Sequence, residues 1–196
     1  MTCAQRPLRA SRSPRKLAAA IGLAAAAALI IGPSSALANS GGIGIGGTDP
    51  APPATGVTTP GTTAKLKNGY AIAPADAPPK VQRAIAAANE IVKGKPYCLG
   101  GGHQRRRDRC YDCSGTVSYA LTGAGLLDYA MPSGSFMRWE APGRGRWITT
   151  YANSGHIYAV IAGLRLDTSM TDGEGPGWSD QMRSAKGYSI RHPARL

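Results

Sequence analysis

The fold is decided by the stretch Asp112-Cys113-Ser114-Gly115-Thr116-Val117-Ser118-Tyr119-Ala120-Leu121. Asp112 stands where helices favour an N-cap residue, so the pattern predicts a helix that begins near Cys113. A cysteine in a first helical turn lies beside unpaired N–H groups and the positive end of the helix dipole, which stabilise a thiolate and an oxyanion. The stretch therefore predicts a nucleophilic cysteine on a helix whose apolar face is made by Val117, Ala120, Leu121 and Ala124.

A candidate base follows Cys113 in the sequence. His156 lies 43 positions further on, after Gly155 and at the head of an apolar run. A thiol nucleophile needs a general base within hydrogen-bond reach, and imidazole commonly serves. We therefore expect His156 to be the base for Cys113.

Helical patterns precede strand patterns in the part of the chain after residue 76. Pro78-Pro79 opens a helical stretch that runs to about Lys93. The nucleophile helix comes next, and short β-rich runs then cover 147–151, 156–162, 164–168 and 188–191. This order predicts a single α+β domain with an antiparallel sheet over 76–196.

The first 75 residues differ in composition from the rest. Five basic residues, an apolar stretch from Leu17 to Gly32 and the tripeptide Ala36-Leu37-Ala38 predict a secretory signal peptide over 1–38. An uncleaved membrane anchor is the alternative, but the apolar stretch is short for a span. Residues 39–75 are rich in Gly, Pro, Thr and Ala and predict a flexible linker.

Part of the positive charge of the chain belongs to the predicted signal peptide. The formal net charge is +12, but removal of the five basic residues before Ala38 leaves 18 basic against 11 acidic residues. The remaining excess favours an anionic polymer such as a cell wall. Secretion and the absence of an aromatic-interleaved basic face argue against nucleic acid. For the run Arg105-Arg106-Arg107, a solvated loop and a substrate-facing patch are both open.

Three cysteines remain after the predicted cleavage, Cys98, Cys110 and Cys113. In an oxidising compartment, the economical assignment pairs Cys98 with Cys110 and leaves Cys113 free to react. Two alternatives stay open. Cys110 and Cys113 have the spacing of a redox dithiol, and the three cysteines with His103 are four potential zinc ligands.

Three segments together resemble the NlpC/P60 peptidoglycan endopeptidases: Pro96-Tyr97-Cys98-Leu99-Gly100-Gly101-Gly102, then Tyr111-Asp112-Cys113-Ser114-Gly115, then Gly155-His156-Ile157-Tyr158-Ala159-Val160 with Gly163. The resemblance implies a papain-like core in which a helix carries the nucleophile against a sheet that carries the base. It implies hydrolysis of a peptide bond in bacterial cell-wall peptides, with Cys113 as nucleophile and His156 as base. Tyr97, Asp112 and Ser114 are then expected to help bind the substrate.

The sequence departs from the family pattern at the group that orients the base. The position after the hairpin contains Asp167, whose carboxylate would fix the imidazole tautomer and stabilise the imidazolium. A turn at Gly163-Leu164 would pair Val160 with Asp167 and leave Asp167 about four residues, or roughly 13 Å, from His156. Thr168 and Asn153 are the alternative orienting residues.

These features predict a secreted cysteine peptidase of the cell wall that acts as a monomer on peptidoglycan peptides, without metal or organic cofactor. The signal sequence is the only expected membrane contact. A peptidoglycan amidase with the same Cys-His pair and a non-catalytic wall-binding module are the alternatives. Trp139, Trp147 and Trp178 are possible stacking surfaces, and His192 is expected to be structural.

Overall fold

A computed structural model describes residues 56–104, 107–169 and 175–196 of the 196-residue chain. The predicted signal peptide and residues 39–55 of the predicted linker lie outside the described residues, as do Arg105 and Arg106. Within the described ranges, no helix is long and apolar enough to span a membrane.

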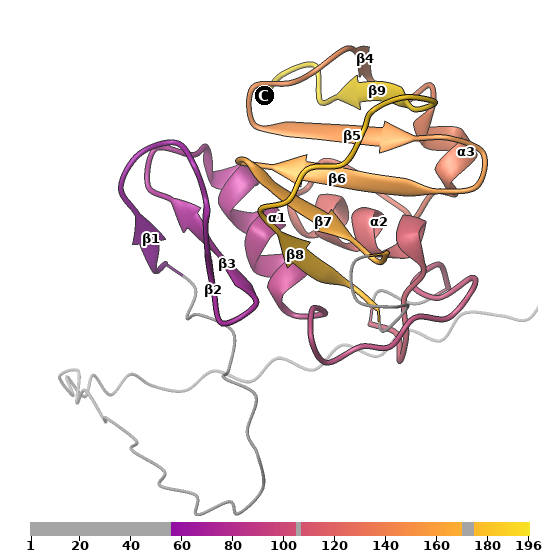
Figure 1. The fold of residues 1–196 in the computed structure, drawn as a ribbon, viewed down its shortest axis with the longest axis horizontal. Helices are drawn as coiled ribbons and strands as arrows, with labels where there is room; N and C mark the ends of the chain where they lie inside the picture. Colours follow the sequence, from indigo (N-terminus) through magenta and orange to yellow (C-terminus); the bar gives the residue numbers. More distant parts are fainter. Residues whose placement is uncertain (1–55, 105–106, 170–174) are drawn as a thin grey trace, which may run out of the picture. The chain divides into compact units, whose positions relative to one another are not determined.

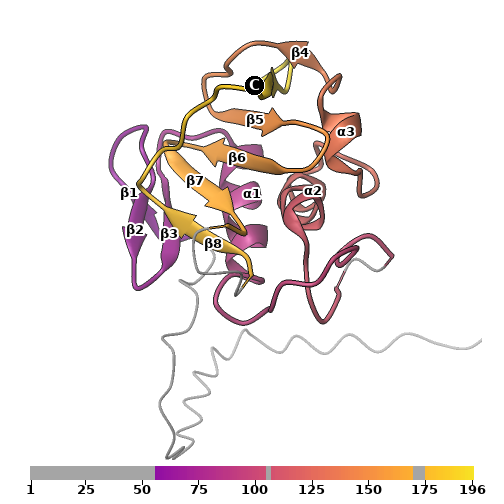
Figure 2. The same ribbon diagram turned by 45° about the vertical axis from the view of Figure 1, so that its right-hand side comes forward.

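Two helices cover one face of a six-stranded antiparallel sheet (Figures 1 and 2). The sheet has the order β4-β9-β5-β6-β7-β8, and a separate three-stranded sheet has the order β1-β3-β2. The prediction of an α+β domain with an antiparallel sheet is confirmed. The elements in chain order are β1 (Thr58–Thr59), β2 (Lys65–Lys67), β3 (Tyr70–Pro74), α1 (Pro79–Asn89), α2 (Cys113–Gly123), α3 (Ser133–Phe136), β4 (Ala141–Pro142), β5 (Ile148–Ala152), β6 (Ile157–Ile161), β7 (Leu164–Asp167), β8 (Gly177–Ser179) and β9 (Ser189–His192).

The helices form where capping and apolar spacing predict them. Pro78 is the N-cap of α1, and Pro79 supplies a preset φ at its first position. Asp112 caps α2, because its carboxylate accepts the Gly115 amide. Both predicted apolar stripes are buried, with Val81, Ile85 and Ala88 on α1 and Val117, Ala120 and Leu121 on α2. Val92 and Ala124 are also buried but lie just beyond the helices, since α1 ends at Asn89 and not near Lys93 as predicted.

The core lies between these helices and the central strands. Ile157, Ala159 and Ile161 alternate along β6 and are completely buried, and Leu166 of β7 joins them in the same apolar cluster. α2 packs on β6 and β7, so the start of α2 lies close to the ends of these strands. The three tryptophans considered as stacking surfaces are instead buried, each at most 9% exposed (Trp139, Trp147 and Trp178).

The predicted domain boundary at residue 76 is wrong, because the segment from Thr58 to Pro74 contributes three strands to the domain, of which β3 packs on α1 and β1 and β2 pair with β3. β2 and β3 form a hairpin around Asn68-Gly69, whose φ angles are 54° and 81°. Asn-Gly is the strongest short-range signal for such a turn, and it was present in the sequence. Small residues hid the strand: Ala71 and Ala73 are buried although they carry little apolar surface.

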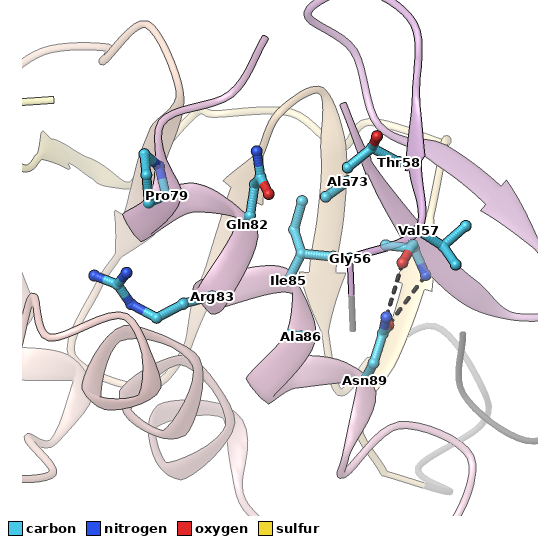
Figure 3. Close-up of a pocket in the computed structure, with 11 residues that line it drawn as sticks. Gly56, Val57, Thr58, Ala73, Pro79, Gln82, Arg83, Ile85, Ala86 and Asn89 are labelled. Atoms are coloured by element: carbon cyan, nitrogen blue, oxygen red, sulfur yellow. Dashed lines mark hydrogen bonds between the residues drawn. The ribbon is translucent and has the colours of Figure 1, made fainter. Parts of the chain in front are cut away.

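Asn89 at the end of α1 joins the N-terminal strands to the rest of the domain. Its amide donates to the Ala71 carbonyl at 2.8 Å and accepts the Ala71 N–H at 3.1 Å and the Trp178 indole N–H at 2.9 Å (dashed in Figure 3 where both partners are drawn). A cavity of about 220 Å³ lies above it between β1, β3 and α1. None of the residues predicted for the functional site lines this cavity.

Candidate active site

Cys113 is the first residue of α2, a free thiol that is 9% exposed. The glycine two positions later explains how the preceding loop approaches the helix so closely. A Cβ on Gly115 would collide with the Gly101 carbonyl oxygen, which itself accepts the Asp112 N–H at 3.1 Å. The sequence Asp-Cys-Ser-Gly therefore combines a cap, the predicted nucleophile and a position where only glycine fits.

The Asp112 carboxylate fixes the loop around the thiol. Oδ1 accepts the Gly115 N–H at 2.6 Å and the Ser114 hydroxyl at 3.0 Å, and Oδ2 accepts the Gly100 N–H at 3.0 Å. His103 Nε2 lies 3.1 Å from Asp112 Oδ1 and 3.0 Å from Ser114 Oγ. The Asp112 and Ser114 side chains thus form hydrogen bonds within the protein, and His103 lies within hydrogen-bond distance of both. The sequence marked His103 only as a potential metal ligand.

A disulfide closes the loop on the other side. Cys98 and Cys110 are bonded, with their Cα atoms 5.6 Å apart, as the economical assignment predicted. Cys110 is therefore not free to form a redox dithiol with Cys113, and two of the four potential zinc ligands are used. Among the described residues no group of three His, Cys, Asp or Glu side chains is arranged to hold a metal ion.

His156 and Asp167 meet across β6 and β7. His156 Nε2 lies 2.9 Å from Asp167 Oδ1. The predicted pairing of Val160 with Asp167 is wrong, since Val160 pairs with Arg165 and Ala159 with Leu166. The turn is Ala162-Gly163, with φ angles of 47° and 87°, rather than Gly163-Leu164. If this register is continued by one residue, Asp167 lies opposite a position on β6 that is only two residues from His156. Side chains at such diagonal positions can contact each other.

The imidazole also interacts with Cys113. The hydrogen bond with Asp167 and then the hydrogen bond with Cys113 raise the pKa of His156 to about 9, against the opposing effect of burial. Because Asp167 occupies Nε2, the nitrogen left for the Cys113 thiol is Nδ1. The structure therefore brings together three of the predicted residues, Cys113, His156 and Asp167, with a hydrogen bond between His156 and Asp167 and with Cys113 close enough to affect the imidazole.

Asp167 is 1% exposed, and its carboxylate accepts hydrogen bonds from several neighbouring groups. Oδ1 also accepts the N–H groups of Thr168 at 2.8 Å and Ser169 at 3.1 Å, and Oδ2 accepts the Ser169 hydroxyl at 3.0 Å. Burial would raise the pKa of Asp167, but the hydrogen bond and charge of His156 and the bonds from Ser169 outweigh it and lower the pKa to about 2.

Two arginines complete the surroundings of this carboxylate. Arg183 Nη1 donates to Asp167 Oδ2 at 3.1 Å, and Arg165 Nε lies 3.6 Å from the same oxygen. Arg165 is two residues before Asp167 on β7, and side chains at this spacing lie on the same face of a strand. The sequence could therefore have placed Arg165 beside Asp167. Arg183 comes from the segment between β8 and β9, and no local pattern in the sequence pointed to it.

The two alternative orienting residues have other partners. Asn153 Oδ1 accepts the backbone N–H groups of Gly155 at 3.0 Å and His156 at 2.8 Å, so it shapes the turn before β6. Thr168 contacts Asp167 through its backbone N–H. Of the three candidates, Asp167 is the one whose side chain reaches the imidazole.

Tyr97 borders the site from the loop before the disulfide. Tyr97 is 40% exposed, and its backbone forms an isolated parallel bridge with Tyr111. Burial, followed by the negative charges of Cys113 and Asp112, raises the pKa of Tyr97. The phenol thus lies within electrostatic reach of Cys113.

Comparison with known proteins finds similarity only to solved structures. No family model matches the sequence, and no curated protein does. The solved structures that are similar include the P60 domain of antigen MAP1204 from M. avium subspecies paratuberculosis, at 20% identity and a TM-score of 0.43, over 57% of this chain and 93% of that one. They also include the peptidoglycan hydrolase RipB from Mycobacterium tuberculosis, at 22% identity and a TM-score of 0.45, over 58% of this chain and 64% of that one. A hypothetical invasion protein of Mycobacterium tuberculosis matches at 23% identity and a TM-score of 0.43, over 57% of this chain and 61% of that one. The match thus spans less than two thirds of the latter two chains.

Proposed function

We propose that this protein is a thiol peptidase that hydrolyses peptide bonds in the stem peptides or cross-bridges of bacterial peptidoglycan. The observation that carries the proposal is the His156 imidazole, which is hydrogen-bonded to the buried Asp167 carboxylate and lies close enough to Cys113 for that residue to raise its pKa further. This is the arrangement that a thiol nucleophile, its general base and an orienting acid require.

The proposed reaction has two halves. The Cys113 thiolate attacks the carbonyl carbon, so that a C–S bond forms, and the C–N bond breaks while the His156 imidazolium gives its proton to the departing amine. Water then attacks the thioester. His156 takes a proton from that water, the C–S bond breaks, and the peptide leaves as a carboxylic acid.

The start of α2 supplies N–H donors for the negative charge that develops on the carbonyl oxygen during the attack. The amides of Gly115 and Thr116 are committed to the Asp112 side chain and carbonyl. Those of Cys113 and Ser114 precede them and have no acceptor within a helix. The Cys113 N–H is therefore the donor we assign to the oxyanion of the tetrahedral intermediate, with the helix dipole adding to it.

The assignment to cell-wall peptides outside the cytoplasm has independent support. The resemblance to the NlpC/P60 endopeptidases covers both the nucleophile and the base segments. The Cys98–Cys110 disulfide is typical of proteins exported to oxidising compartments. The excess of basic residues suits an anionic wall polymer.

The decisive experiment is digestion of purified peptidoglycan by the full-length chain and by its Cys113→Ala and His156→Ala variants. Both variants are expected to lose all measurable release of fragments while they keep the native circular dichroism spectrum. His192→Ala is the matched control, because His192 bonds to the Gly143 carbonyl, away from the thiol. Activity retained in either site variant would overturn the mechanism.

Mass spectra of the products separate the proposed peptidase from its alternatives. Fragments with newly freed peptide ends support the peptidase, whereas intact stem peptides released from sugar would identify an amidase. A non-catalytic wall-binding module would release neither. It would also leave Cys113 no more reactive toward iodoacetamide than an ordinary thiol.

A further inference from the structure

A basic hollow lies on the face of the six-stranded sheet opposite the helices. It measures about 370 Å³, a size typical of small-molecule sites. Thr149 and Tyr151 of β5 and Tyr158 and Val160 of β6 form its floor. The segment between β8 and β9, which crosses this face in Figure 1, contributes one wall.

Three arginines from two segments line the hollow: Arg144 and Arg146 from the segment before β5, and Arg183 from the segment after β8. As far as the described part of the chain forms it, the lining contains no Asp or Glu. Arg183 pairs with Asp167, which does not line the hollow, and positive charge gathered in a concave site attracts an anion and concentrates its field there.

Aromatic rings hold two of these arginines in place. The Arg183 guanidinium lies 5.4 Å from the centre of the Tyr158 ring and 5.6 Å from that of Tyr188. Tyr158 stacks on Tyr151 at 4.6 Å, and the Arg146 guanidinium lies 5.3 Å from the Trp147 ring. Cation–π contacts of this kind fix a side chain before a ligand arrives, which lowers the entropic cost of binding.

The number of guanidinium groups indicates the ligand. One guanidinium satisfies a carboxylate by pairing with both of its oxygens. Three guanidinium groups match a group with oxygens on several sides. We propose that this hollow is a binding site for a phosphate ester group, separate from the proposed thiol site and not required for its chemistry.

Arg183 connects the two sites. Its Nη1 donates to Asp167 Oδ2 at 3.1 Å and to Ser169 Oγ at 2.8 Å, while the same residue lines the hollow. A guanidinium carries donors on three nitrogens, so these two bonds do not exhaust it. Binding of a phosphate ester at Arg183 therefore changes the field at Asp167 and at the imidazole bonded to it.

The test measures binding of glycerol 3-phosphate to the full-length chain by isothermal titration calorimetry at low salt. Saturable binding of one equivalent is expected, and glycerate, which carries a carboxylate in place of the phosphate, is expected to bind at least about tenfold more weakly. The Arg144→Gln/Arg146→Gln variant should lose about ten- to hundredfold in affinity for glycerol 3-phosphate. Lys186→Gln is the control, because Lys186 is exposed in the same segment as Arg183 but does not line the hollow.

The His156 ring resonances locate the ligand. Addition of glycerol 3-phosphate should shift them in the wild-type chain through Arg183 and Asp167. Vesicles that contain phosphatidylglycerol tell whether a lipid supplies the group: tighter binding to vesicles than to glycerol 3-phosphate assigns it to a lipid, and the reverse assigns it to a soluble or wall-linked ester. No saturable binding of either, equal loss in the double variant and Lys186→Gln, or binding without a shift at His156 would overturn the proposal. These results do not depend on peptidase activity.

Discussion

The two sides of the candidate active site are held by different forces. On the nucleophile side, a disulfide and backbone N–H groups bonded to Asp112 fix the loop around Cys113. On the base side, charged groups surround Asp167, which takes bonds from His156 and Arg183. The first side is covalent and local, so we expect it to govern stability. The second depends on charge, so we expect it to govern activity and its pH dependence.

The largest effect is expected on the base side, from Asp167→Asn. An amide keeps the size of the carboxylate but supplies no charge to the imidazolium, so kcat on peptidoglycan should fall by roughly three orders of magnitude. Asn153→Ala is the control, because Asn153 bonds only to backbone N–H groups near His156. A loss in Asn153→Ala equal to that in Asp167→Asn would mean that the orienting residue is wrongly assigned.

The pH profile sharpens the same contrast. With its pKa raised to about 9, His156 is an imidazolium at neutral pH, and it loses the proton needed by the departing amine as the pH rises through that value. We expect kcat/KM to fall about tenfold per pH unit above pH 9. In Asp167→Asn the fall should begin at lower pH, because the bond to Asp167 is the main cause of the raised pKa. An unchanged profile in that variant would contradict this explanation.

The same two pKa values set the pH dependence of stability on the base side. The contribution of His156 is complete below its ordinary pKa of 6.5 and is lost as the pH rises through about 9. The contribution of Asp167 is present above its ordinary pKa of 3.8 and is lost as the pH falls through about 2. Urea denaturation should therefore show an unfolding free energy that is constant between about pH 3.8 and pH 6.5 and that falls on either side of this range.

A smaller effect on activity is expected from removal of the disulfide. Cys98→Ser/Cys110→Ser opens a loop with a sequence separation of 12, which should lower the free energy of unfolding by about 3 kcal/mol. Where the variant is still folded, kcat should change only a few-fold, because Asp112 still holds the loop through the Gly100 N–H. Complete loss of activity in a folded variant would show that the disulfide itself positions the thiol.

The smallest effect is expected from His103→Ala. The substitution removes one partner of Asp112 and Ser114, but the Gly100 and Gly115 N–H groups still bond to the carboxylate. We expect a loss of about 1 kcal/mol in stability and less than about a fivefold change in kcat/KM. A change in the alkaline limit of the pH profile would instead couple His103 to His156.

Local signals in the sequence predicted much of this molecule. The Asp112 cap and the apolar stripe of α2 predicted a helix from Cys113, and the structure has it there. The N-terminal strands were missed because alanines supply their buried positions, although Asn68-Gly69 marked the hairpin. Arg183 was not predicted beside Asp167, since only the course of the segment after β8 brings them together.

By itself, the sequence determined the nucleophile helix, the strand that follows His156 and the α+β class, because each depends on capping and spacing between near neighbours. The tertiary structure decided that Asp167 reaches His156. Both Ala162-Gly163 and Gly163-Leu164 contain a glycine, so the sequence left two registers open. Backbone bonds from outside the hairpin hold Ala162 at positive φ: its N–H donates to the Trp147 carbonyl at 2.7 Å, and its carbonyl accepts the Ala64 N–H at 2.8 Å. These bonds offset the cost of that conformation, and the resulting register shortens the separation of His156 and Asp167 to a distance that one hydrogen bond spans.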